Sequence, residues 1–109
     1  MKLLNRGFAH VRPTHLWMDW ALANANETPF FTSMPEATLY LVEEDFWEEE
    51  DMIKKYYKKI FYQECLTVCD DETLWPILSN HEDFLLYFDM EFGTFVYDLL
   101  KTDLIAEKI

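Results

Sequence analysis

The sequence predicts a small α+β fold, in which helices pack on one face of a three-stranded sheet. Two short runs of β-forming residues indicate strands, and one long amphipathic helix is expected over about residues 45–66. Half of the 109 residues are apolar and 17% are aromatic, while only two are glycine. This composition favours a single globular domain over residues 1–109 with its own core, and it argues against disorder.

The first strand is predicted over residues 7–12, where GFAHVR alternates between two faces and stops at Pro13. A short helix is expected next, capped by Thr14 and continuing to Ala25, because its apolar residues recur at nearly helical spacing. A strand over residues 16–20 is the alternative for the same stretch.

Residues 24–36 have the composition of a loop, since they contain two asparagines and two prolines. Phe30 and Phe31 are expected to pin this loop to the core. Residues 38–42, TLYLV, are rich in β-forming side chains and predict a second, largely buried strand.

The long helix is expected to begin at Asp45, with Glu48 completing a capping box. Acidic residues dominate its first turns, where the helix dipole favours negative charge. Two i,i+4 ion pairs are predicted, Glu50 with Lys54 and Asp51 with Lys55. Its apolar stripe consists of Phe46, Ile53, Tyr56, Tyr57, Ile60, Phe61 and Cys65.

The last third of the chain is expected to start with a pinned turn at residues 74–76, LWP. Ser79 or Asn80 then caps another helix. The apolar residues of that helix recur at helical spacing as Phe84, Leu85, Phe88 and Phe92. Residues 93–100 predict the third strand, and a continuing helix is the alternative there.

The net charge of −12 lies entirely in residues 43–109, which hold six basic and eighteen acidic side chains. Such a surface repels nucleic-acid phosphates and anionic lipid, so neither direct nucleic-acid binding nor membrane binding is expected. No eighteen-residue apolar run is present that would span a bilayer. A basic protein remains the expected partner.

The two cysteines, Cys65 and Cys69, share one face of the predicted long helix but lack disulfide geometry. With His81 or His15 they could contribute to a zinc site, but a fourth ligand in a zinc-binding frame is missing. Two buried thiols are therefore expected, and no cofactor or metal is predicted. Reduced thiols, and an N-terminus unlike a signal peptide, indicate the cytoplasm.

Two groups of residues are candidates for a site. Asp19 stands between Trp17 and Trp20, whose rings could raise its pKa or enclose a cation, with His10 or His15 as a partner. The alternative is that Asp19 faces solvent while its neighbours face inward.

The second candidate is an acidic cluster that has seven carboxylates within residues 43–51. Its members Glu43, Glu44 and Glu48 are candidate contacts for a basic partner. A solvated helix start is the simpler interpretation. The cluster lacks the ligand spacing of an EF-hand, and no catalytic nucleophile frame occurs in the chain.

Several short segments resemble a family of small acidic bacterial cytosolic proteins. These are N-R at residues 5–6, V-R-P at 11–13, W-x-D-W at 17–20, Y-L-V-E at 40–43, D-E-T-L-W-P at 71–76 and Y-F-D-M-E-F at 87–92. The resemblance implies a bacterial, cytosolic origin. It carries over no activity and no functional residue.

Three functions follow as hypotheses. The favoured one is a non-enzymatic protein-interaction module with an acidic surface. One alternative is a polyanion mimic or immunity-type inhibitor of a basic protein. The other is a small enzyme or ligand binder centred on Asp19, although the missing catalytic frame makes an enzyme the less favoured class. An exposed aromatic patch would also allow a homodimer.

Overall fold

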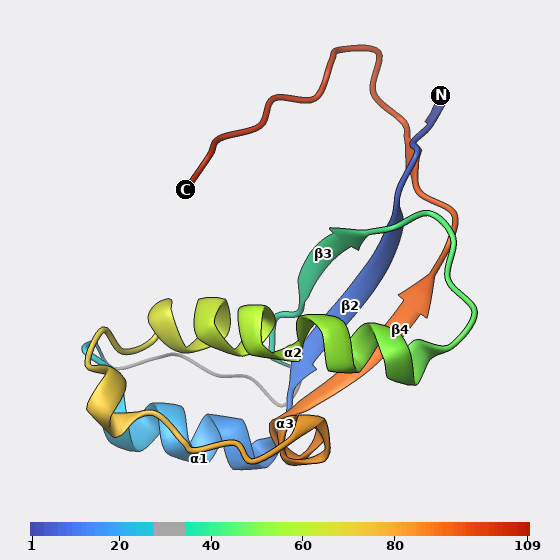
Figure 1. The fold of residues 1–109 in the computed structure, drawn as a ribbon. Coiled ribbons are helices and arrows are strands. Elements are labelled where there is room, and N and C mark those ends of the chain that lie inside the picture. Colours follow the sequence, from blue (N-terminus) through green and yellow to red (C-terminus); the bar gives the residue numbers. More distant parts are fainter. Residues whose placement is uncertain (28–34) are drawn as a thin grey trace.

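The computed structural model describes residues 1–27 and 35–109, so the expectation for Phe30 and Phe31 lies outside the described residues. The elements are, in chain order, β1 (Lys2–Leu3), β2 (Gly7–Pro13), α1 (His15–Asn24), β3 (Thr38–Val42), α2 (Glu49–Leu66), the 3₁₀ helix η1 (Glu72–Leu74), α3 (His81–Tyr87), β4 (Phe88–Gly93) and β5 (Tyr97–Asp98). The predicted α+β class is confirmed. Helices pack on one face of a three-stranded sheet (Figure 1).

The main sheet has the strand order β3-β2-β4, and both pairings are antiparallel. Its central strand β2 alternates as predicted, with Ala9 and Val11 fully buried toward the helices. Because β2 and β3 are antiparallel neighbours, α1 joins two adjacent strands rather than forming a parallel crossover.

The third strand lies earlier in the chain than predicted. Residues 88–93 form β4, whereas the prediction placed them at the end of a helix and put the strand at 93–100. Phe88 and Phe92 fit the helical period, but with Met90 they also fit a period of two, which leaves Asp89 and Glu91 exposed. Pairing with β2 favours the second arrangement.

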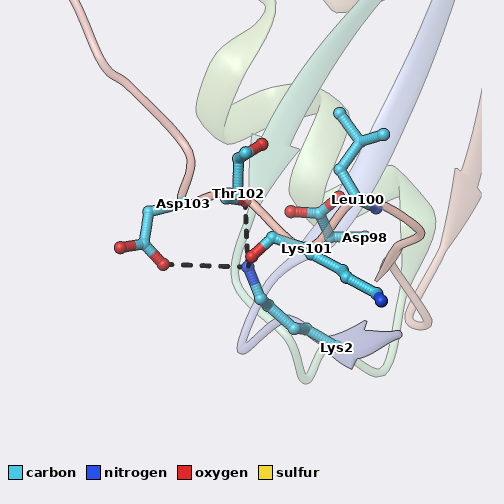
Figure 2. A network of polar contacts seen from close by, with 6 residues as sticks. All are labelled: Lys2, Asp98, Leu100, Lys101, Thr102 and Asp103. Atoms are coloured by element: carbon cyan, nitrogen blue, oxygen red, sulfur yellow. Dashed lines mark hydrogen bonds and ion pairs between the residues drawn. The ribbon is translucent and has the colours of Figure 1, made fainter.

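Of the predicted strand at residues 93–100, Gly93 is the last residue of β4, and the rest contains only the two-residue strand β5. In this segment β5 pairs with β1, Lys2 opposite Asp98 and Leu3 opposite Tyr97, to form a second small sheet. Lys2 also contacts the segment that follows β5, as Figure 2 shows. Its Nζ donates to the Thr102 carbonyl at 3.0 Å and lies 3.7 Å from the Asp103 carboxylate.

The long helix α2 begins at Glu49, four residues later than predicted. Asp45 does not cap it, and the residue at the N-cap position, Glu48, makes no side-chain cap hydrogen bond. Its buried residues are Met52, Ile60, Phe61, Glu64 and Cys65. The predicted stripe therefore omitted Met52 and Glu64.

The core contains side chains from the main sheet and from all three α-helices. Its largest cluster of buried residues consists of Val11, Trp17, Met18, Ile60, Phe61, Cys65, Phe84 and Phe88. Aromatic rings meet edge-on within it, as where Trp17 and Phe61 have centroids 6.1 Å apart. In a smaller cluster of buried residues, Met52 of α2 packs on Ala9 and Val42 of the sheet.

The two short helices differ in how they begin. Asn80, one of the two predicted caps, caps α3, since its Oδ1 accepts from the Asp83 amide at 3.0 Å. Thr14 precedes α1 as predicted but does not cap it with its side chain. Its hydroxyl donates instead to the Leu86 carbonyl at 2.7 Å, which ties the start of α1 to α3.

The strand β3 is less buried than predicted. Leu39 and Leu41 are about half exposed, because they lie on the sheet face away from the helices. Tyr40 and Val42 alternate with them and face inward. Since β3 is also an edge strand, the described residues cover only one of its faces and one of its edges.

Candidate functional site

The acidic segment, residues 43–51, is largely exposed and connects β3 to α2. Within the described residues, ion pairs join only two of its seven acids to bases. Glu50 lies 3.4 Å from Lys54, which confirms one predicted i,i+4 pair. The predicted pair of Asp51 with Lys55 is wrong, because the Lys55 ammonium binds Glu43 at 2.9 Å instead.

Glu43 is a structural residue rather than a free surface charge. The Tyr56 hydroxyl donates to its carboxylate, and this bond together with the Lys55 ammonium lowers the pKa of Glu43 to about 2. The three side chains tie the end of β3 to the middle of α2. Glu44 and Glu48, the other predicted partner contacts, are exposed.

Trp47 is fully exposed at the centre of the acidic segment, with a relative accessibility of 101%. Tryptophan buries a large apolar area in cores and interfaces, so leaving a whole indole in water is unfavourable. The sequence interpretation considered only the carboxylates here. The sequence contained a signal for this exposure. Glu48 follows Trp47, and no apolar residue stands one or two helical turns after Trp47, where the two-turn positions are Lys54 and Lys55.

The predicted site at Asp19 does not assemble around its two tryptophans. Trp17 is buried and Trp20 is partly buried, their ring centroids lie 4.8 Å apart, and Asp19 is exposed. The Trp20 indole donates to the Leu74 carbonyl at 2.8 Å. His15 is exposed on the same helix, whereas His10 lies on the opposite sheet face, away from the helices.

A different carboxylate shares a groove with Trp17. Glu64 of α2 is only 9% exposed, and it borders a groove of about 560 Å³ that Trp17, Thr38 and Tyr40 also line. The Tyr40 hydroxyl donates to Glu64 Oε2 at 2.8 Å. The Thr38 hydroxyl lies 3.2 and 3.3 Å from its two oxygens. The groove therefore combines a buried acid with an aromatic wall.

Burial is the main cause of the pKa shifts of Glu64 and Tyr40, two titratable side chains in this groove. It raises the pKa of Glu64, although the hydrogen bonds from Tyr40 and Thr38 act in the opposite direction. Burial also raises the pKa of Tyr40, and the adjacent carboxylate raises it further. The Tyr40 hydroxyl consequently keeps its proton and remains a hydrogen-bond donor.

Sequence reasoning missed Glu64, although its position gave a signal. It stands four residues after Ile60 and one before Cys65, on the apolar stripe of α2. A charged residue on an apolar helix face is unusual and indicates a buried polar interaction. The partners could not be named from the sequence, because they belong to β3.

The two cysteines are free thiols and are buried, as predicted. Burial raises the pKa of Cys65 to about 12, so this thiol is unreactive in the folded chain. Among residues 1–27 and 35–109, no group of three or more His, Cys, Asp or Glu side chains could hold a metal ion. In the same residues, no helix combines the length and apolar character needed to cross a membrane.

Comparison with known proteins adds no family to these observations, since no family model, curated protein or solved structure matches the chain. The fold defines the protein as a small α+β protein with an antiparallel core sheet. The resemblance to small acidic bacterial proteins stays a prediction.

Proposed function

We propose that the protein is a non-enzymatic interaction module that binds a basic protein partner through the acidic segment. The observation that supports this proposal is the full exposure of Trp47 among carboxylates. Tryptophan and arginine are the residues most enriched at interface hot spots, and an arginine guanidinium stacks well on an indole face. An exposed tryptophan within an acidic segment therefore suits an arginine-bearing surface.

The charges of the segment have a separate role. Five of its acids form no ion pair within the described part of the chain, and they include Glu44 and Glu48. Charges of this kind steer a basic partner toward the site and raise its association rate, while the central aromatic residue determines the dissociation rate. Trp47 and the acids should thus affect binding differently.

The experiment compares affinity capture by the wild-type chain and by Trp47→Ala, at low salt and at roughly 0.5 M salt, where screening is nearly complete beyond contact distance. Ile77→Ala is the matched control, because Ile77 is also exposed but lies outside the acidic segment. We expect a set of basic proteins that Ile77→Ala retains. Trp47→Ala and high salt should each remove it.

Two outcomes would contradict the proposal. One is a partner set indifferent to salt, and the other is capture by Trp47→Ala equal to that of the wild type. Displacement of the captured proteins by duplex DNA would support the alternative function, in which the chain mimics a polyanion at a nucleic-acid-binding surface. That result is also compatible with a role for Trp47, so the variant remains the decisive comparison.

A further inference from the structure

Glu64 is a buried carboxylate without a counter-ion among the described residues. From residues 1–27 and 35–109, it accepts three hydrogen bonds, all from the hydroxyls of Tyr40 and Thr38, and neither group carries positive charge. No lysine, arginine or histidine of the described part of the chain forms an ion pair with it. Burying an ionised group without an opposite charge is unfavourable, so a cation entering the groove would relieve that penalty.

The surroundings of Glu64 have the size and character of a small-molecule site. The groove holds about 560 Å³, within the usual range of roughly 300–1,000 Å³ for ligand pockets. Trp17, Val68 and Pro13 give it apolar and aromatic walls. Ile109 reaches its mouth but is itself 96% exposed, so it borders the groove without filling it.

The neighbouring surface limits what the ligand can carry. A second groove, of about 730 Å³, shares Tyr40, Gln63 and Ile109 with the first and is lined by Lys58 and Lys59. These ammonium groups disfavour a further positive charge on that side. Glu36 also lines the first groove, but it is exposed and solvent screens its charge, so Glu64 is the buried acid with which a single cationic group would pair.

We propose that the groove between β3 and α2 binds a small organic monocation, whose ammonium or guanidinium group pairs with Glu64 while its apolar body packs on the wall that Val68 and Pro13 form beside Trp17. Glu64 is the charge partner, and the Tyr40 and Thr38 hydroxyls position its carboxylate. The partly exposed Val68 and Pro13 provide most of the wall, since Trp17 is only 3% exposed. This site is separate from the acidic segment, so the test of the groove does not depend on the proposed function.

The probe is 2-phenylethylamine, a primary ammonium with an aromatic body, and 2-phenylethanol is its uncharged counterpart of nearly the same shape. Each is titrated into the ¹⁵N-labelled full chain at about 0.15 M salt while backbone and indole resonances are followed. We expect the largest shifts at Trp17, Thr38 and Tyr40. The amine should bind about tenfold or more tightly than the alcohol, since the amine can form an ion pair with the carboxylate and the alcohol can donate only a single hydrogen bond from an uncharged hydroxyl.

Glu64→Gln keeps the size of the side chain and removes its charge, so it should reduce the affinity for the amine to that for the alcohol. Glu49→Gln is the matched control, because it removes one exposed acid elsewhere on α2 and should leave the affinity unchanged. Two results would overturn the proposal: equal binding of amine and alcohol by the wild type, or shifts confined to the acidic segment. The first requires no variant, so it decides the question even if Glu64→Gln fails to fold.

Discussion

Removing the Tyr40 hydroxyl tests whether the buried acid of α2 is held as the geometry indicates. In Tyr40→Phe the ring remains, and Glu64 loses the donor that lies 2.8 Å from its Oε2. A hydrogen bond to a charged group contributes about 1.5–3 kcal/mol to the free energy of unfolding, and one to a neutral group about 0.5–1.5 kcal/mol. The loss should therefore approach the higher range wherever Glu64 is ionised.

That loss translates into a measurable change of melting temperature. An unfolding entropy of about 2.1 cal/mol/K per residue gives roughly 0.23 kcal/mol/K for 109 residues. Tyr40→Phe should then melt about 7–13 °C below the wild type when the carboxylate is charged. Thermal and urea unfolding, followed by circular dichroism across a pH series, measure the difference.

The pH series distinguishes the mechanism from a general packing defect. The hydroxyl stabilises the ionised carboxylate, so the gap between wild type and Tyr40→Phe should widen as pH rises through the raised pKa of Glu64. Tyr62→Phe is the matched control on an exposed tyrosine and should change stability by less than about 0.5 kcal/mol. An equal loss in both variants, or a gap independent of pH, would refute the reasoning.

Two further predictions concern the junction of β2, β3 and α2. Gly7→Ala should destabilise the fold by about 1–3 kcal/mol in urea unfolding, because the added Cβ would lie 2.6 Å from the Glu43 carbonyl oxygen and 2.9 Å from that of Gly93. Glu43→Gln should destabilise it near neutral pH. The difference from wild type should close as pH falls from the ordinary pKa of 4.5 toward about 2, since the contribution of a carboxyl with a lowered pKa is lost on protonation.

Each of these has its own control. Gly93→Ala brings the new Cβ against the ring of Phe8, a side chain that can turn away, so its loss should be smaller than that of Gly7→Ala. The reverse order would contradict the close backbone approach at Gly7. Glu49→Gln changes the same charge without the Tyr56 contact, and a matching pH profile would contradict the role assigned to Glu43.

Parts of the fold could be predicted because their signals are local. The alternation of residues 7–12 specified the two faces of β2, and Ser79 and Asn80 marked the start of α3 to within one residue. The helical period also placed most of α2, since Ile60, Phe61 and Cys65 repeat on one face. Hydrophobic periodicity and side-chain capping act over a few residues, so the sequence contains them in full.

Other features depended on contacts between distant segments. Phe88 and Phe92 satisfy both the helical and the strand period, and only the edge of β2 made residues 88–93 a strand. In the same way Lys55 could pair with Asp51 along the helix or with Glu43 across the turn. The end of β3 lies close enough to select Glu43.

The sequence by itself determined the acidic surplus, the buried thiols, the α+β class and the presence of one long amphipathic helix. Tertiary structure alone decided which acid is buried. Asp19 remains exposed although tryptophans flank it in sequence, whereas Glu64 is covered because β3 docks beside α2 and supplies Thr38 and Tyr40. Burial is a property of surfaces that meet in space, and adjacency in sequence does not specify it.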